Sequence, residues 1–294
     1  MQNENTIHVS VSYNKFKKSL KMKIFTMTLA VALISLTSTA KAQEPISADQ
    51  QRGWNVSAGG GLIVAPTYMG DDEYQFMAVP NVRVTYDDKF FASIQEGAGY
   101  NVINNENWRI GPLARYDFGR DEDGDSALRI GGEDTDDLRG LGDVDGTAEL
   151  GAFAEYKMQP LSAKLEILQG VGGHDGLRGN ASLKYSARTQ INQQAIMLAF
   201  GPEIMFADSS YHDAYFGVDA GQSAASGLGQ YDPEGGILSY GIGGSVIMPI
   251  TERVSSVFFA SYNRLGDEAA NSSLVEERGS PHQGTAGLFI NYSF

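Results

Sequence analysis

The chain ends in Gly284-Thr285-Ala286-Gly287-Leu288-Phe289-Ile290-Asn291-Tyr292-Ser293-Phe294, and this stretch decides the fold. Its even positions hold Ala, Leu, Ile, Tyr and Phe, whereas its odd positions are mostly small or polar. Successive side chains of a β-strand point to opposite faces, so the segment is predicted to be a strand with one apolar and one polar face.

The same alternation recurs in segments of about ten residues from Gly53 onward, which is the dyad pattern of a transmembrane β-barrel. Tyr, Trp and Phe recur at the strand ends, where such a barrel places its aromatic girdles. A final Phe preceded by apolar residues at every second position also resembles the assembly signal of outer-membrane barrels. The clearest apolar faces are Trp54, Val56, Ala58, Leu62 and Val64; Phe76, Ala78, Val82, Val84 and Tyr86; Trp108, Ile110, Pro112, Ala114, Tyr116 and Phe118; Ala148, Leu150, Ala152, Ala154 and Tyr156; and Ala181, Leu183, Tyr185 and Ala187.

The first 42 residues have the order of a secretory signal peptide. A basic region that includes Lys15 and Lys23 precedes an apolar stretch from Ile24 to Leu36, and the small-residue site Ala40-Lys41-Ala42 follows. We therefore expect a cleaved signal peptide over 1–42, a short periplasmic segment over 43–52 and a barrel over 53–294. The basic region is unusually long, and Met22 is an alternative start.

Residues 43–294 contain 16 Lys and Arg against 35 Asp and Glu, a formal charge of −19. Such a chain repels phosphate backbones, which argues against a nucleic-acid partner. Within the strands, charged side chains of both signs lie on the polar faces, among them Arg109, Arg115, Asp117 and Glu149. A barrel lumen can hold them, whereas the interior of a β-sandwich cannot, because burying unpaired ions costs more than the net stability of a fold. The same faces could be the solvent side of a sandwich, but the signal peptide and the last strand favour the barrel.

Loop lengths predict the topology, because these barrels have short periplasmic turns and longer external loops. Short turns are expected at Asp87-Asp88, Asn104–Asn107, Gln159-Pro160, near Gln190–Asn192 and at Thr251-Glu252. Long connections are expected at 66–74, 119–146, 171–180, 207–236 and 265–283. A further turn near Gln95–Gly97 keeps Glu96 off the lipid face. The prediction is an all-β fold: a transmembrane, antiparallel, up-and-down barrel of about twelve strands.

Two groups of residues are candidates for chemistry. The acidic loop that runs to Asp145 begins with Asp121, Asp123 and Asp125 at alternate positions, but the sixth and twelfth positions of a calcium loop are Ser126 and Gly132 instead of Gly and Glu. We therefore interpret it mainly as an external loop exposed to solvent or lipopolysaccharide, with specific cation binding as the alternative.

The second group comprises His174, His212 and His282, which fall in the long connections. A hydrolase would need a nucleophile within hydrogen-bond reach of such a base, which the sequence does not reveal. We assign no catalytic, cofactor-binding or metal-binding residue, and no cofactor. The absence of cysteine leaves no thiol chemistry. The segment from Tyr215 to Leu228 is rich in small residues and is either a loop that folds into the lumen or an ordinary surface loop.

Several stretches resemble the MipA/OmpV family, the MltA-interacting outer-membrane proteins, in their order along 53–294. These stretches are Pro66-Thr67-Tyr68-Met69-Gly70, Gly97-Ala98-Gly99-Tyr100-Asn101, Gly111-Pro112, Ala214-Tyr215-Phe216-Gly217-Val218, Gln222-Ser223, Ser226-Gly227-Leu228, Leu265-Gly266-Asp267-Glu268-Ala269-Ala270, Ser273-Leu274-Val275, Gly287-Leu288 and Tyr292-Ser293-Phe294. Asn271-Ser272-Ser273 departs from the pattern, because the family tends to have a Ser-Pro pair there.

The resemblance implies an outer-membrane barrel with a scaffolding role for a lytic transglycosylase and a peptidoglycan synthase, in contact with outer-membrane lipid and lipopolysaccharide. It implies no catalytic residues. The alternative is a narrow channel for small hydrophilic solutes, because a barrel of about twelve strands is wide enough for a pore. A hydrolase active at the barrel rim is the third hypothesis.

Overall fold

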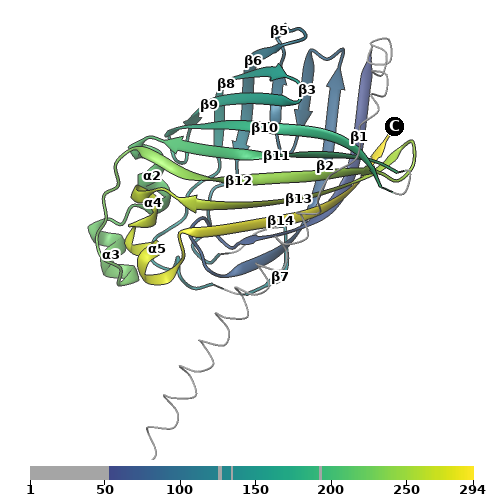
Figure 1. Ribbon diagram of the computed structural model, residues 1–294. Helices are drawn as coiled ribbons and strands as arrows, with labels where there is room; N and C mark the ends of the chain where they lie inside the picture. Colours follow the sequence, from purple (N-terminus) through teal and green to yellow (C-terminus); the bar gives the residue numbers. More distant parts are fainter. Residues whose placement is uncertain (1–52, 125–127, 134, 192–193) are drawn as a thin grey trace, which may run out of the picture. The chain divides into compact units, whose positions relative to one another are not determined.

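The computed structural model describes residues 53–124, 128–133, 135–191 and 194–294, so the expected signal peptide and N-terminal segment lie outside the described residues. The described chain forms a closed antiparallel barrel of twelve strands, as predicted (Figure 1). Its strands are β1 (Trp54–Pro66), β2 (Tyr74–Tyr86), β3 (Phe90–Ser93), β4 (Gly97–Tyr100), β6 (Trp108–Asp117), β8 (Thr147–Met158), β9 (Leu161–Val171), β10 (Leu177–Ile191), β11 (Gln194–Ala207), β12 (Gly236–Pro249), β13 (Val254–Leu265) and β14 (His282–Ser293).

Strand β1 closes the barrel, because it pairs along one edge with β2 and along the other with β14. At the middle of β1, Leu62 lies opposite Ala78 of β2 and Leu288 of β14. Two further short strands lie outside the main path: β5 (Ile103–Asn104) pairs with β6, and β7 (Arg129–Gly132) pairs with β2.

The two faces of β14 are those that its sequence predicts. Leu288 and Ile290 are 48% and 45% exposed on the outside, whereas Phe289 is 6% exposed and stacks on Phe259 of β13 in the lumen. Aromatic pairs lie at the ends of the strands, as expected for girdles. The outward pairs are Trp54 with Tyr86, Trp108 with Tyr156, and Tyr116 with Phe118.

The turns divide the barrel into two ends. Residues 87–89, 105–107, 159–160 and 250–253 join strands at one end, which we call the short-turn end, and the turn at 94–96 between β3 and β4 has the predicted position. The turn expected near Gln190–Asn192 lies partly outside the described residues. The opposite end, which we call the long-loop end, carries the connections 67–73, 118–146, 208–235 and 266–281.

One predicted long connection, 171–180, is wrong. Strand β9 extends to Val171 and β10 begins at Leu177, so only 172–176 lie between them. This tight turn needs a left-handed backbone at Gly172 (φ 81°) and Gly173 (φ 60°), which glycine allows without a steric penalty.

The wall of the barrel has a notch above β3 and β4. These strands have four residues each, and β3 pairs only with Arg83 to Tyr86 of β2. Towards the long-loop end, the same edge of β2 pairs with β7 from Gln75 to Met77. Between these two regions, no strand of the described chain pairs with this edge of β2.

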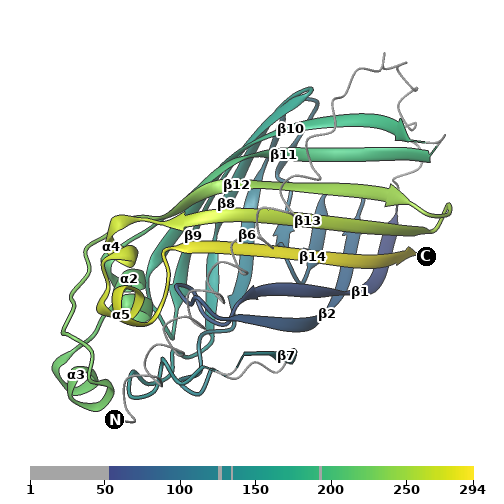
Figure 2. The same cartoon turned by 60° about the horizontal axis from the view of Figure 1, so that its bottom comes forward.

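The long loops contain helices, which the sequence did not predict. They are α2 (Ser209–Phe216), α3 (Ala220–Ser226), α4 (Asp267–Ala270) and α5 (Ser273–Arg278). Figure 2 shows them gathered at the end of the barrel opposite the C-terminus. None of the described helices has the length and apolar character needed to cross a membrane.

The two faces of β14 lead to a first prediction. Replacing Leu288 by Arg puts a charge on the lipid face near the middle of the strand, and should destabilise the barrel by about 2–4 kcal/mol. Thr285→Arg on the lumen face of the same strand is the control and should cost much less. Urea unfolding of the protein refolded in lipid vesicles measures both, and equal losses would contradict the assignment of the faces.

Candidate functional site: a buried ion cluster under a helical cap

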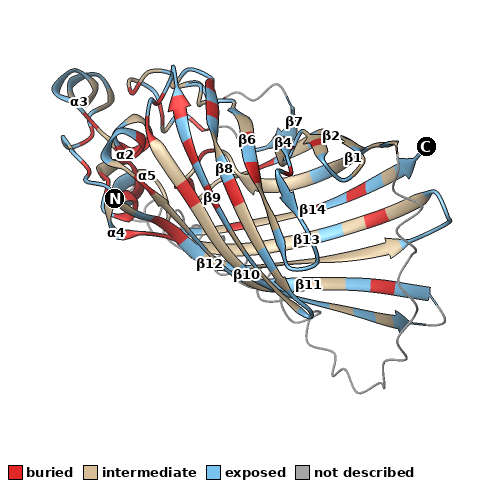
Figure 3. Ribbon diagram, turned by 90° about the horizontal axis from the view of Figure 1, so that it is seen from above, coloured by how far each residue is buried: buried red, intermediate tan, exposed pale blue. Residues whose placement is uncertain are grey.

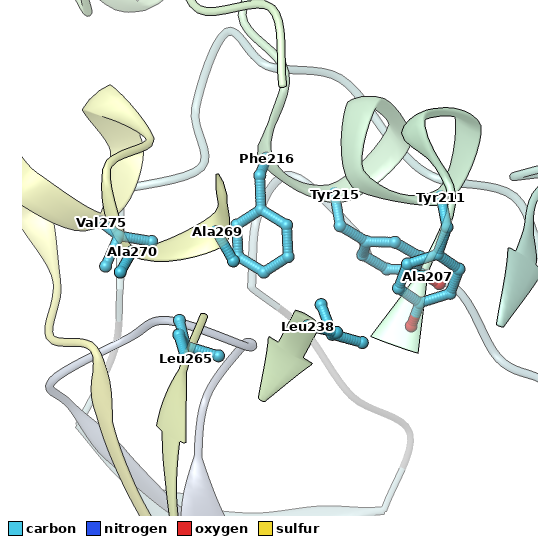
Figure 4. Packing of buried hydrophobic residues seen from close by; sticks show 9 residues of the cluster. All are labelled: Ala207, Tyr211, Tyr215, Phe216, Leu238, Leu265, Ala269, Ala270 and Val275. Carbon is cyan, nitrogen blue, oxygen red and sulfur yellow. The ribbon is translucent and has the colours of Figure 1, made fainter. Parts of the chain in front are cut away.

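The described residues of the connections 67–73, 118–146, 208–235 and 266–281, with their four helices, pack together at the long-loop end, and we call them the cap. Figure 3 shows that many buried residues lie in and beside these helices. A first apolar core joins the cap to the ends of β11, β12 and β13 (Figure 4), and consists of Ala207, Tyr211, Tyr215, Phe216, Leu238, Leu265, Ala269, Ala270 and Val275. A second core lies within the cap and consists of Tyr68, Leu138, Leu141, Val218, Leu228 and Leu274.

The cap cores are built largely from the stretches that carry the family resemblance. Phe216 and Ala269 are fully buried in the first core, and Tyr68, Val218 and Leu274 meet in the second although they come from three different loops. Ser272, in the stretch that departs from the family pattern, is also fully buried, and its hydroxyl donates to the carbonyl oxygen of Phe216 at 2.6 Å.

The segment from Tyr215 to Leu228 is interpreted from its sequence either as a loop that folds into the lumen or as a surface loop, and each interpretation fits one part of it. Its first residues belong to α2, and the Tyr215 hydroxyl donates to Asp117 at the end of β6 at 2.9 Å. Helix α3, in contrast, has no buried residue and lies on the surface. Asp219 caps α3 by accepting from the Gln222 amide at 2.8 Å, and the left-handed Gly227 ends the helix.

An ion cluster lies beneath α2, at the point where the lumen meets the cap. Glu149 of β8 is fully buried, and its carboxylate accepts two hydrogen bonds from Arg178 of β10, one of them from Nη2 at 2.6 Å. The same Nη2 lies 3.9 Å from Asp117 Oδ2. A two-pronged contact of this kind satisfies both carboxylate oxygens, which burial of a charge requires.

Aromatic residues of α2 cover this cluster. The Arg178 guanidinium lies 5.9 Å from the centre of the Tyr211 ring, and the His174 ring lies 4.9 Å from it. Burial raises the pKa of Tyr211 and of Tyr215 above the ordinary value, so both phenols stay protonated. Tyr215 is therefore a hydrogen-bond donor to Asp117, and it ties α2 to the barrel wall.

The cluster also brings together three groups of the kind that bind metals. One ligand atom from each of Asp117, Glu149 and His174 lies within 4.8 Å of the others. However, the Arg178 guanidinium already supplies the positive charge. In addition, His174 Nδ1 accepts from the Gly176 amide at 3.1 Å, whereas the outer nitrogen of a metal-bound His normally donates. The residues fit an ion pair better than a metal site.

The sequence missed this cluster because its members come from distant positions. Asp117 and Glu149 were placed correctly on polar strand faces. His174 and Arg178 fell within the wrongly predicted connection 171–180, so neither was associated with the lumen.

The hydrogen bond that His174 Nδ1 accepts from the Gly176 amide leaves the proton of a neutral His174 on Nε2. This nitrogen faces Glu149 Oε1 at 3.5 Å.

The three histidines do not come together. His212 is fully buried in α2 and its Nδ1 lies 2.9 Å from the carbonyl oxygen of Asp208, whereas His282 is exposed and contacts the Tyr262 hydroxyl at 2.7 Å. Among the described residues, no Ser or Thr hydroxyl hydrogen-bonds to any of the three rings. The geometry thus offers no support for a hydrolase at the rim.

The acidic loop uses its carboxylates internally. Glu122 accepts from the amides of Gly140 and Gly142, both at 3.2 Å, and Asp143 accepts from the Glu122 amide at 2.8 Å. Asp121 likewise accepts from the Asp123 amide at 2.9 Å. Asp125 lies outside the described residues. These contacts fold the loop and assign no cation to it.

Asp71, in the first loop of the cap, is fully buried. Its Oδ1 accepts from the Glu73 amide at 2.9 Å, whereas its buried Oδ2 has no hydrogen-bond partner. Burial raises the pKa of Asp71 to about 7. Folding therefore favours the protonated carboxyl.

The chain is similar to one protein family and to two outer membrane proteins. The family model described as "MltA-interacting protein MipA" matches residues 58–294. The outer membrane protein Omp26La of Vibrio anguillarum is 31% identical over 123 residues, which are 41% of this chain and 46% of that protein. The outer membrane protein OmpV of Vibrio cholerae is 31% identical over 91 residues, or 31% of this chain and 34% of that protein. The matched part thus spans less than half the length of either relative.

Among solved structures, the NanC porin aligns with a TM-score of 0.38 at 8% identity, over 81% of this chain and 98% of that one. A bacterial polysaccharide outer membrane secretin aligns with a TM-score of 0.41 at 9% identity, over 83% and 99%.

The ion cluster leads to a second prediction. Glu149→Gln removes the carboxylate that Arg178 contacts directly and leaves it with the more distant Asp117, 3.9 Å away, which should destabilise the protein by up to about 3–5 kcal/mol. Asp136→Asn is the control, because it breaks the exposed pair with Arg139, in which the two side chains are 80% and 67% exposed. Urea unfolding should show a large loss for the first variant and almost none for the second. If the two variants unfold at similar urea concentrations, the ion cluster does not stabilise the folded protein.

A third prediction concerns pH. Because folding raises the pKa of Asp71, its contribution to stability is complete below the ordinary Asp pKa and is lost as the pH rises to about 7. Stability should fall in this window by up to about 1.4 kcal/mol per pH unit. Asp71→Asn should remove this part of the pH dependence. Parallel pH profiles of the urea midpoint for the two proteins would contradict the prediction.

Proposed function

Because the chain belongs to the MipA family, we propose that it is a structural barrel that holds peptidoglycan-remodelling enzymes at the outer membrane. That it is an outer-membrane β-barrel of the MipA/OmpV type follows from the family and the fold. The scaffolding role is the proposal. It includes a lytic transglycosylase as one partner, in line with the family's description as MltA-interacting, and a peptidoglycan synthase as another.

The cap is the observation that carries this proposal. Two apolar cores and the tie from Tyr215 to Asp117 hold it on the long-loop end. A scaffold needs a stable body and does not need an open passage. We also propose that the protein has no catalytic activity of its own, because among the described residues no Ser or Thr hydroxyl hydrogen-bonds to the rings of His174, His212 or His282.

The surface for these partners would lie at the short-turn end. Barrels of this class place their short turns in the periplasm, on the side of the peptidoglycan. Apolar residues that lie outside the strands are exposed at this end. Val102 is 67% exposed, Ile250 is 54% exposed and the C-terminal Phe294 is 79% exposed. Apolar residues of this kind are common at the centres of protein interfaces.

Site-specific crosslinking tests the scaffolding role. A photoreactive residue at Thr251, in the turn between β12 and β13, should capture a lytic transglycosylase in intact cell envelopes. The same residue at Asp232, in the cap, is the matched control and should capture none. If neither position, nor a third at Asn105, captures a peptidoglycan enzyme, the scaffolding role is wrong.

A channel is the second candidate, because ion pairs in the middle of the lumen remain partly exposed. Arg115 and Lys164 both pair with Glu166, at 3.2 and 2.6 Å, and their side chains are 20% and 28% exposed. We expect the packed cap at the long-loop end to limit the conductance of the wild-type protein in planar bilayers. A variant in which a short Gly-Ser linker replaces 209–235 should conduct more. Robust conductance by the wild type would favour the channel.

A further inference from the structure

A cavity of about 350 Å³ lies in the lumen at the short-turn end, on the side away from the cap. This volume is within the range of cavities that bind small molecules. Its walls come from β2, β3, β5, β6, β8 and the turns beside them. The lining residues are Arg83, Thr85, Asp88, Phe90, Phe91, Asn101, Asn104, Arg109 and Lys157.

The charge of this lining is positive. It includes three basic side chains from three different strands and only one carboxylate, that of Asp88. Arg83 pairs with Glu96 at 2.6 Å and Arg109 with Glu155 at 3.2 Å, but neither of these acids lines the cavity. The ammonium group of Lys157 forms no ion pair within the described residues.

The guanidinium of Arg109 is held in place on several sides. Its Nε donates to Asn101 Oδ1 at 3.1 Å. Its central carbon, Cζ, lies 5.1 Å from the centre of the Phe91 ring and 5.1 Å from that of the Phe153 ring. Asn101 is itself fixed, because its Nδ2 donates to the carbonyl oxygen of Asp88 at 2.5 Å. A binding group whose position is set before the ligand arrives loses less entropy on binding.

We propose that this cavity binds a small solute that carries a carboxylate or a phosphate group and enters from the short-turn end. The planar fork of an arginine suits either anion, and the Lys157 ammonium adds a further positive charge to the same lining. Phe90 and Phe91 supply an apolar wall for the body of the solute. The proposal is independent of the scaffolding role, because it needs no partner protein and no passage through the cap.

Calorimetric titration of the full mature chain, refolded in detergent micelles, tests the proposal with three probes. Glucuronate carries the carboxylate, inorganic phosphate carries the phosphate, and glucose is the neutral match to glucuronate. We expect glucuronate, phosphate or both to bind at least tenfold more tightly than glucose, and the tighter of the two identifies the preferred anion. Equal affinities for all three probes would overturn the proposal.

Variants then locate the site. Lys157→Gln should weaken anion binding at least fivefold, and Lys157→Glu should abolish it. Both should fold, because Lys157 has no ion-pair partner to lose, and heat-modified mobility on gels checks this. Arg253→Gln removes a cation from another short turn outside the cavity and should leave the affinity unchanged. If Arg253→Gln weakens binding as much as Lys157→Gln, the effect is one of net charge and the cavity is not the site.

Discussion

The pairing of β1 with both β2 and β14 is the constraint on which the rest of the structure depends. Within a bilayer, backbone N–H and C=O groups find no water, so a spanning sheet must close on itself. The first and last long strands of the chain meet through this pairing, and Leu62 stands between its two partners at the seam. Closure leaves one face of each strand to the lipid and the other to an interior space. The apolar face can then be continuous around the barrel, and every charged strand residue must find its place inside.

Charges inside a barrel need partners, and here the partners connect the barrel to its loops. In the middle of the lumen, Glu166 is neutralised by Arg115 and Lys164 in partly exposed pairs. At the long-loop end, Glu149 is fully buried, its partner Arg178 is only 15% exposed, and Tyr211 of α2 lies over the Arg178 guanidinium. The polar lumen and the apolar cap therefore depend on each other. The cap covers the ion pair of Glu149 and Arg178, and the hydrogen bond from Tyr215 to Asp117 attaches the cap to the barrel wall. The stretches that resemble the MipA/OmpV family lie largely in this part of the protein, which suggests that the family's likeness is a likeness of the cap as much as of the barrel.

The sequence predicted the barrel well because a strand in a membrane obeys a simple rule of alternation. The faces of β14, the aromatic ends of the strands, the short turns and the break at 94–96 could all be read from period two and from turn residues. The cap helices could not, because α4 and α5 have four and six residues and are too short for a helical period to stand out. The ion cluster was missed for a different reason. The proximity of Glu149 and Arg178 depends on the register of three strands, and an error in the extent of one turn was enough to move His174 and Arg178 out of the lumen.

The notch above β3 and β4 makes the outer wall of the barrel asymmetric, so that one side differs from the others within the plane of the membrane. A uniform cylinder presents the same wall at every angle, so its neighbours have no preferred side. Here one sector has two strands of four residues, and Arg83 and Glu96 pair beside them with both side chains about two-fifths exposed. A transmembrane strand needs about nine to eleven residues, so these two strands leave that sector with less apolar wall for acyl chains than the rest of the barrel, which favours a polar lipid headgroup, water or another protein there. The lipids and proteins that surround the barrel in the outer leaflet therefore meet different surfaces on different sides. The barrel has a preferred orientation about its own axis relative to these neighbours.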